Sequence, residues 1–477
     1  MTRLAQRVFN EQDQLRFARV SGDYNLIHID AIQARRIQAG AQVVDGIQLL
    51  LWALDALAKE MPELAPLCSI RVQFNKFVYL AEEAEVVLTR HSSSGAQLRI
   101  SAHNLTRSKI VLSFGEAIDP GPQWSASAME EFRVAREPLH PSLDEMAQIS
   151  GRLPFLMPEA EAMDLFPAAA RWIGTRAIAA LAASTQLVGM VCPGLHSIYN
   201  GLSLDRCIEV NPQDSLAFRV PKVDARFNTV EQEIAGGGWA GTASSFVRTP
   251  PVEQAAMSSL AGVVEATEFA GSVALVVGGS RGLGELTAKI LAAGGARVIV
   301  TWQRGKEDAE RVAREIREAG GRCDALAYDA RKPAAEQLQP LEVASTHAYY
   351  FATPIIFRPQ AEIFAASRLK EFLHIYVDGF WQLCSALRAR HPSLSVFYPS
   401  SVAVSERPDG MTEYAMAKAA GEVLCAEMNV SLAPMHVIVN RLPRLATDQT
   451  ASIVAVETAS ALETMLPLIR EVQARRS

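Results

Sequence analysis

The sequence has few cysteines, and none of them stands in a metal-binding or disulfide-framework pattern. Six cysteines are scattered through 477 residues, with no CxxC pair and no zinc-like spacing. This distribution predicts free thiols in a reducing cytoplasm and no metal site.

An excess of one charge is also lacking. The chain carries 46 basic and 52 acidic residues, a formal net charge of −6, so no bulk field favours nucleic acid or anionic lipid. Hydrophobic residues make up 49% and charged residues 21%, a balance that excludes a disordered chain, a collagen-like fibre or a disulfide scaffold. The opening MTRLAQRVFNEQDQLRFARV has no apolar core, so we expect no secretory signal.

One long stretch, residues 177–204, contains no Asp, Glu, Lys or Arg and is long enough to span a bilayer. It is rich in small and polar residues and includes Pro193 and His196. We therefore predict a buried helix followed by a buried strand, with no membrane span. His196 is expected to pack at the strand start.

The length predicts about three domains. The composition changes at Asp119–Pro122 (DPGP) and at 248–254 (RTPPVEQ), where prolines interrupt helices and strands. We predict domains at 1–120, 121–252 and 269–477, with a linker at 253–268.

The first two domains look like copies of one plan, in which an apolar helix precedes several strands. In the first, a helix at 46–61 precedes strand-like runs at 69–77, 85–91 and 97–104; in the second, a helix at 175–189 precedes runs at 197–204, 215–220 and 242–247. This pattern favours a sheet wrapped around a central helix. Two unrelated α+β modules are the alternative.

The third domain alternates strands with amphipathic helices. Strands are predicted at 273–277, 297–301, 323–328, near 349 and at 394–398, with helices at 285–294 and 307–319. Such alternation predicts βαβ units and a doubly wound parallel α/β sheet of the Rossmann type.

A glycine-rich turn joins the first of these strands to its helix. It reads VVGGSRGLG and includes Gly278, Ser280, Arg281, Gly282, Leu283 and Gly284. Glycine lets the backbone approach a pyrophosphate, and the helix N-terminus offers N–H groups to it. A structural turn without nucleotide is the alternative.

The cofactor follows from charge. An NAD site places an acid near the end of the second strand, but this strand ends in TWQR (301–304). Arg281 and Arg304 suit a 2′-phosphate, so we predict NADP(H). The alternative is that both arginines are solvated surface charges that bind no phosphate.

Further along, Tyr414 and Lys418 share a helical face at i and i+4. A nearby ammonium favours tyrosinate and is expected to lower the phenol pKa. Ser401 precedes Tyr414 by thirteen residues and is placed to hold a substrate carbonyl.

Residues 269–450 resemble the short-chain dehydrogenase/reductase family. The turn is similar to its TGxxxGxG with Val277 in the threonine place, and Asp329 matches the residue that touches adenine. The resemblance implies hydride transfer between NADP(H) and a carbonyl, with Ser401, Tyr414 and Lys418 as the catalytic set. The family's NNAG is replaced at 351–353, its helix asparagine is Tyr376, and a helix at 459–475 stands in place of the last strand.

The segment SGDYNLIHID (21–30) holds Asp23 and His28. A carboxylate and an imidazole aimed at one water suit its addition across a double bond. The alternative is that Asp23 caps the turn and His28 only packs.

This segment resembles SGDxNPxHxD of (R)-specific enoyl-CoA hydratases and MaoC-like dehydratases, which have the hot-dog fold. Leu26 replaces the proline, and Asp45-Gly46 replaces a His-Gly pair. The resemblance implies Asp23 and His28 as acid and base, and the Gly46 N–H as oxyanion donor. With the similar segment 192–203, it implies a double hot dog in which only the first half keeps the motif.

Together these features predict a bifunctional enzyme that reduces 3-oxoacyl and dehydrates 3-hydroxyacyl thioesters of coenzyme A or acyl carrier protein. The family resemblances imply fatty-acid or polyketide-type metabolism and, by analogy, a homodimer. Two alternatives stay open: a dehydratase with a degenerate reductase-like domain, and a non-enzymatic acyl-binding module.

Overall fold

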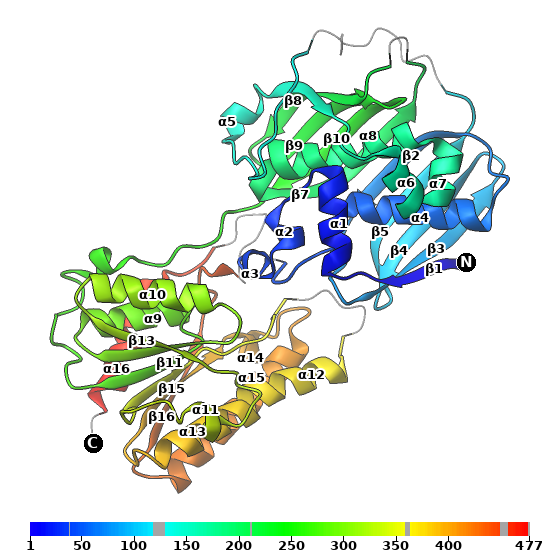
Figure 1. Ribbon diagram of the computed structural model, residues 1–477. Helices are drawn as coiled ribbons and strands as arrows, with labels where there is room; N and C mark the ends of the chain where they lie inside the picture. Colours follow the sequence, from blue (N-terminus) through cyan, green and yellow to red (C-terminus); the bar gives the residue numbers. More distant parts are fainter. Residues whose placement is uncertain (38, 118–128, 210–211, 358–362, 449–456, 476–477) are drawn as a thin grey trace. The chain divides into compact units, whose positions relative to one another are not determined.

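The computed structural model describes residues 1–477 apart from 38, 118–128, 210–211, 358–362, 449–456 and 476–477. The described chain divides into two compact units, residues 1–250 and residues from 251 onward (Figure 1). The predicted boundary at Asp119–Pro122 lies outside the described residues.

The N-terminal unit is built on one ten-stranded antiparallel sheet, in the order β1-β3-β4-β5-β2-β7-β10-β9-β8-β6. The strands are β1 (Thr2–Val8), β2 (Leu67–Phe74), β3 (Glu83–Ser92), β4 (Gly95–Ala102), β5 (Leu105–Phe114), β6 (Ser150–Pro154), β7 (Ser197–Arg206), β8 (Ser215–Asp224), β9 (Thr229–Gly236) and β10 (Trp239–Val247). Read inward from either edge, the two halves repeat one strand order, since β6-β8-β9-β10-β7 mirrors β1-β3-β4-β5-β2.

Each half carries one long buried helix between its first and second strands. These helices are α4 (Gly46–Glu60) and α8 (Thr175–Gln186), which continues into a π-helical segment, Leu187–Val191. Both are apolar on almost every side, which is the pattern of a helix enclosed by protein. Shorter helices are α1 (Glu11–Ser21), α2 (Leu26–Ile29), α3 (Ala31–Ala34), α5 (Leu143–Met146), α6 (Glu159–Leu165) and α7 (Pro167–Ile173).

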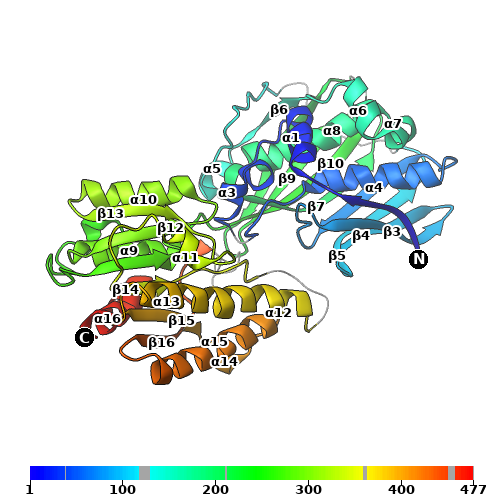
Figure 2. The same cartoon turned by 60° about the horizontal axis from the view of Figure 1, so that its bottom comes forward.

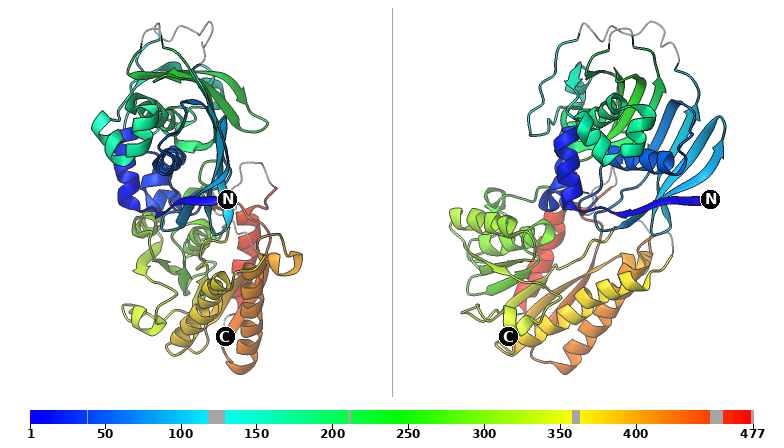
Figure 3. Two further views of the ribbon diagram at one scale, coloured as in Figure 1. Left: turned by 90° about the vertical axis from the view of Figure 1, so that its right-hand side faces the viewer. Right: turned by 45° about the vertical axis from the view of Figure 1, so that its right-hand side comes forward.

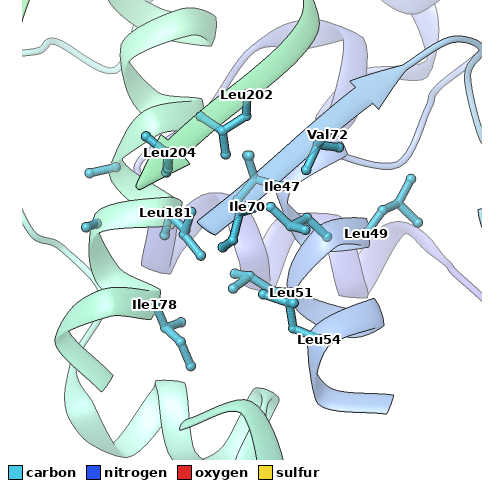
Figure 4. Packing of buried hydrophobic residues seen from close by; sticks show 14 of the residues in the cluster. Ile47, Leu49, Leu51, Leu54, Ile70, Val72, Ile178, Leu181, Leu202 and Leu204 are labelled. Atoms are coloured by element: carbon cyan, nitrogen blue, oxygen red, sulfur yellow. The ribbon is translucent and has the colours of Figure 1, made fainter. Parts of the chain in front are cut away.

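Strands β2 and β7 join the halves at the centre of the sheet, where Ile70 pairs with Leu204 and Val72 with Leu202. These side chains meet apolar residues of α4 and α8 in one continuous core (Figure 4). The long helices lie on one face of the curved sheet (Figure 3, left). This shared core therefore packs the two halves of the unit against each other.

The uncharged stretch 177–204 folds into a helix and a strand, and the helix is buried as predicted, whereas the strand is mostly half-buried. It contains most of α8, the π-helical segment and the first part of β7. Among the described residues, no helix has the length and apolar character needed to cross a membrane.

The C-terminal unit has a six-stranded parallel sheet in the order β13-β12-β11-β14-β15-β16, as the alternating pattern predicted. Its strands are β11 (Val273–Val277), β12 (Arg297–Trp302), β13 (Arg322–Ala327), β14 (His347–Tyr350), β15 (Ser395–Ser401) and β16 (His436–Leu442). The sequence analysis missed β16, an edge strand whose burial does not alternate regularly.

Helices cover both faces of this sheet (Figure 2). They are α9 (Gly282–Ala293), α10 (Lys306–Glu318), α11 (Ala334–Gln337), α12 (Ala366–Leu373), α13 (Phe380–Arg388), α14 (Ala403–Glu406), α15 (Thr412–Ser431) and α16 (Ala461–Ala474), with a π-helical segment at His374–Gly379. Successive residues of a strand point to opposite faces of the sheet and pack in two separate hydrophobic cores. Val276 belongs to one core and Leu275 to the other. The chain closes with the predicted helix, α16.

Candidate active sites

Asp23 lies in the short connection between α1 and α2, where Gly22 ends α1 in a left-handed conformation (φ 80°). The side chain is buried, with 3% of the residue exposed. Its Oδ1 accepts a hydrogen bond from the Asn25 N–H (2.9 Å), and its Oδ2 lies 2.8 Å from the Thr185 hydroxyl. The turn thus aims the carboxyl group into the protein, toward α8.

Asn25 ties this turn to the second half of the unit. Its Nδ2 donates to the carbonyls of Gly189 (2.9 Å) and Gly194 (3.0 Å), and its Oδ1 accepts from the Ile27 N–H at the start of α2. The residue is fully buried. Because its amide satisfies two carbonyls of the other half, it positions Asp23 relative to that half.

His28 lies on α2 with a defined tautomer. Its Nδ1 is 2.9 Å from the Val43 carbonyl, which can only accept, so Nδ1 carries the hydrogen. The basic Nε2 then faces the Asp45 carboxyl group, whose Oδ2 is 3.8 Å away. His28 is therefore oriented as a base.

Asp45 caps the N-terminus of α4. Its Oδ1 accepts from the backbone N–H groups of Ile47 (2.7 Å) and Gln48 (3.0 Å), while Oδ2 points to Thr185 at 2.7 Å. Gly46 follows as the first residue of α4, where an N–H has no acceptor within the helix. A side chain at Gly46 would crowd the Phe74 ring, at 3.1 Å.

The sequence analysis missed Thr185, which reaches these carboxyl groups from α8. A hydroxyl next to Ser184 in an alanine-rich helix was the available signal. Gly189 lies just beyond, and a side chain there would collide with the Asp23 carboxyl group. The acidic pair is thus enclosed by both halves of the unit.

The pKa of Asp23 is raised to about 6, mainly by burial and in part by the neighbouring Asp45 carboxylate. His28 and the Asn25 N–H act in the opposite direction. A carboxyl group with this pKa can hold and release a proton near neutrality.

Asp23, His28 and Asp45 also form the one group of potential metal ligands found among the described residues, with one ligand atom from each within 4.8 Å of the others. The Thr185 hydroxyl already contacts the inward oxygens of both carboxyl groups.

His196, in the second half, packs at the start of β7 as expected. Burial lowers its pKa to about 4, with Arg248 acting in the same direction. An imidazole with this pKa stays neutral at pH 7 and is a weak base.

In the C-terminal unit, the glycine-rich turn lies between β11 and α9, with α9 beginning at Gly282. Gly278 and Gly282 have positive φ (78° and 58°), and a side chain at Gly278 would lie 2.9 Å from the Phe351 backbone. A side chain at Gly284 would collide with the Gly278 carbonyl. Ser280 is buried, and Leu283 is half-buried on α9. The turn therefore needs glycine to bring α9 against the strand.

The predicted phosphate-binding arginines differ in their surroundings. The Arg281 guanidinium lies 3.3 Å from the Asp448 carboxylate, an acidic neighbour that a 2′-phosphate would have to displace or share. Arg304 is exposed just beyond β12. Asp329, after β13, accepts from the Gln303 amide (3.2 Å) and pairs with Arg331 (3.1 Å).

Ser401, Tyr414 and Lys418 come together at the end of β15 and the start of α15. Ser401 is the last residue of β15 and hydrogen-bonds the Tyr414 hydroxyl. The Lys418 ammonium donates to the Pro399 carbonyl (2.6 Å). It lies within 6 Å of three tyrosine ring centroids: Tyr376 (3.9 Å), Tyr398 (4.9 Å) and Tyr414 (5.9 Å).

The expected lowering of the Tyr414 pKa by Lys418 is wrong. Burial instead raises the Tyr414 pKa, and only the Ser401 hydrogen bond opposes it. The ammonium donates to the Pro399 carbonyl and lies closer to the ring of Tyr376 than to that of Tyr414. Burial also lowers the pKa of Lys418 to about 7, which weakens its charge near neutral pH.

Tyr376 replaces the family asparagine inside the π-helical segment. Its hydroxyl lies 2.5 Å from that of Thr353, and its ring stacks on Phe372 with centroids 5.8 Å apart. The ring thus covers Lys418 where the resemblance predicted a polar side chain.

Comparisons with known proteins match each unit separately. The family described as MaoC like domain matches residues 2–109, and short chain dehydrogenase matches residues 272–346. The uncharacterized oxidoreductase YgfF of Escherichia coli is 29% identical over 185 residues, covering 35% of this chain and 73% of that protein. A short-chain dehydrogenase/reductase of Pestalotiopsis microspora is 44% identical over 62 residues, 13% of this chain and 23% of that protein.

Solved structures similar to part of this chain include two with NADP bound. A short chain dehydrogenase from Burkholderia cenocepacia, in complex with NADP, is 23% identical with a TM-score of 0.39, covering 44% of this chain and 94% of that one. A 3-oxoacyl (acyl-carrier-protein) reductase from Agrobacterium tumefaciens is 20% identical with a TM-score of 0.36, covering 39% and 74%.

Proposed function

Because this chain joins a MaoC-like dehydratase domain to a short-chain dehydrogenase domain, we propose that it acts twice on the β-carbon of an acyl thioester. The C-terminal unit reduces a 3-oxoacyl group with NADPH. The N-terminal unit dehydrates the resulting 3-hydroxyacyl group to the 2-enoyl thioester, or runs the hydration. Tethering the two activities raises the local concentration of the shared intermediate.

The observation that carries this proposal is the proximity of the buried Asp23 to the partly buried His28, with one potential ligand atom of each within 4.8 Å of the other. The Nδ1 of His28 is engaged by the Val43 carbonyl, which leaves Nε2 as the basic nitrogen. In hydration, His28 takes a proton from water, the water oxygen bonds to the β-carbon, and Asp23 gives a proton to the α-carbon. The Gly46 N–H, at the start of α4, holds the thioester oxygen as negative charge develops. Dehydration reverses these steps.

The repeated strand order supports a double hot dog, with domains at 1–120 and 121–252 around α4 and α8. The first half supplies Asp23, His28 and Gly46. The second supplies the wall that encloses them. A homodimer follows only by analogy with both families.

For the reductase, we assign NADP(H) to the turn formed by Gly278, Ser280, Arg281, Gly282, Leu283 and Gly284, with Arg304 and Asp329 beside it. The close packing at Gly278 and Gly284 supports this, because it leaves backbone N–H groups at the start of α9 for the phosphates. When bound, the cofactor supplies the hydride. Tyr414 gives the proton to the carbonyl oxygen, Ser401 holds that oxygen, and Lys418 supports Tyr414.

The hydratase assignment is tested by the loss of enoyl absorbance when short 2-enoyl thioesters of coenzyme A and of acyl carrier protein are hydrated. His28→Ala in the full chain should lower the rate by about 10² to 10⁴-fold. His140→Ala, an exposed position, is the matched control and should leave the rate unchanged. An unchanged rate in His28→Ala would show that the site is assigned to the wrong residues.

A dehydratase with a non-catalytic reductase-like unit is the second candidate, and the Tyr376 ring over Lys418 favours it. NADPH oxidation with a 3-oxoacyl thioester separates the two. Oxidation supports the bifunctional enzyme, whereas hydration without any oxidation supports the second candidate.

A further inference from the structure

The Thr185 hydroxyl lies between two buried carboxyl groups. Its Oγ1 is 2.8 Å from Asp23 Oδ2 and 2.7 Å from Asp45 Oδ2, and all three residues are at most 3% exposed. A hydroxyl has one hydrogen, so it can donate to one carboxylate while accepting from a second group. Both contacts are full hydrogen bonds when one of the two carboxyl groups carries a proton.

The surroundings of the two carboxyl groups decide where that proton resides. Asp45 Oδ1 accepts two backbone N–H groups at the start of α4, where the helix dipole also favours a negative charge. Asp23 accepts a single backbone N–H and lies against the other acid. Two adjacent buried carboxylates repel each other, so the less stabilised one, Asp23, holds the proton.

We propose that Thr185 is a positioning residue that makes Asp23 and Asp45 share a single proton, which leaves Asp23 as the acid and Asp45 as the anion beside His28. This inference rests on the proposed hydratase function and adds two residues to its site. Thr185 donates its hydrogen to Asp45 and accepts the hydrogen of Asp23.

With this assignment, each proton that Asp23 and His28 give or take in one hydration can be followed. Before the reaction, the acidic pair holds one proton and His28 is neutral. When water adds, Asp23 loses its proton to the α-carbon and His28 gains one from water. The Asp45 carboxylate, 3.8 Å from Nε2, balances the imidazolium that forms. Asp45, which stands where the related motif has histidine, thereby gains a role suited to an acid.

The groups that face this pair from the neighbouring elements are few. They are His28 on α2 and Tyr199 on β7, whose hydroxyl donates to Ser184 (3.1 Å). Burial raises the Tyr199 pKa above its ordinary value, so the phenol stays neutral through the working range. The pH dependence of the pair is therefore coupled mainly to His28.

The test compares Thr185→Val with Thr185→Ser in the full chain, using a short 2-enoyl-CoA as the probe. Valine keeps the shape but removes the hydroxyl, and we expect a loss of about 100-fold in hydration rate. Valine also removes the acceptor of the Asp23 hydrogen and the donor to the Asp45 carboxylate, which together stabilise the singly protonated pair. The high-pH limb of the rate profile, where Asp23 loses its proton, should therefore move downward, by about one unit. Serine should restore both within about threefold. Ser184→Ala, which removes a neighbouring buried hydroxyl that contacts neither acid, should leave the limb in place.

If the Thr185→Val enzyme is slower but the high-pH limb of its rate profile lies at the wild-type pH, the inference is overturned, because a purely structural role predicts that result. If the wild-type chain hydrates no thioester, the proposed function fails, and the inference is then decided separately. Carboxyl ¹³C NMR titration, with Asp23→Asn to assign the signals, should show one raised pKa that is lower in Thr185→Val than in the wild type. The same titration in both proteins would refute the shared proton.

Discussion

The two proposed catalytic centres differ in how far apart their residues lie in the chain. Ser401, Tyr414 and Lys418 come from one strand and the next long helix, within eighteen residues. The acid–base group of the N-terminal unit joins Asp23 to Thr185, 162 residues later. Each centre adjoins a π-helical segment, a feature that often marks functional sites. Local motifs thus reveal the first kind of centre almost completely and the second kind only in part.

The largest expected effect is a loss of reductase activity that leaves hydratase activity intact. Tyr414→Phe should lower NADPH-dependent reduction of a 3-oxoacyl thioester by about 10² to 10⁴-fold, because it removes the proton donor. Hydration of a 2-enoyl thioester should be unchanged in the same protein. Parallel assays of both activities check this, and reduction that survives in Tyr414→Phe would remove the tyrosine from the mechanism.

The sequence predicted both motifs because each is compact. SGDYNLIHID places Asp23 and His28 in one turn, and Tyr414 and Lys418 follow helical spacing. Sheet type in the C-terminal unit was also predictable, since buried strands alternated with amphipathic helices. The Thr185 contact was not, because only the antiparallel pairing of β2 with β7 brings α8 to the first half.

Environment was harder to predict than position. Lys418 was expected to lower the pKa of Tyr414, but burial and the Pro399 carbonyl determine its behaviour. Sequence spacing places an ammonium near a phenol without specifying which way it points. Similarly, the sequence showed Asp45 in place of a histidine without revealing that one of its oxygens is engaged by the first turn of α4.

A second expected effect concerns the attachment between the halves. Asn25→Ala should destabilise the N-terminal unit by about 3 kcal/mol, because it leaves the buried carbonyls of Gly189 and Gly194 without donors. Urea unfolding of the full chain, with hydrogen exchange assigning the transition to residues 1–250, measures the change. Asn200→Ala, half-exposed on β7, serves as the comparison. Equal stability of both variants would mean that Asn25 does not hold the halves together.

A third effect follows from the raised pKa of Asp23, about 6 in the folded protein against about 3.9 when unfolded. Between these values the folded state binds more protons, so the contribution of Asp23 to stability is present below pH 4 and lost as pH rises through 6. Asp23→Asn should therefore gain about 2 kcal/mol relative to wild type on going from pH 4 to pH 7. Denaturation at both pH values checks the sign, and a gain at pH 4 instead would contradict it.

The smallest effect sharpens the cofactor assignment. Arg304→Ala should weaken NADPH binding by about tenfold and leave NADH binding nearly unchanged, because an exposed guanidinium would contact only the 2′-phosphate. Fluorescence titration with the two nucleotides measures the ratio. Arg322→Ala, another exposed arginine of the same sheet, is the control. Parallel weakening of NADPH and NADH would place Arg304 elsewhere in the site.

The most direct test of two linked centres is to give the full chain a 3-oxoacyl thioester with NADPH and follow the thioester products by mass spectrometry. We predict the 3-hydroxyacyl and 2-enoyl thioesters together, with His28→Ala stopping at the 3-hydroxyacyl product and Tyr414→Phe forming neither. A wild-type chain that oxidises no NADPH, or that makes the 3-hydroxyacyl product without any 2-enoyl product even at equilibrium, would contradict the account.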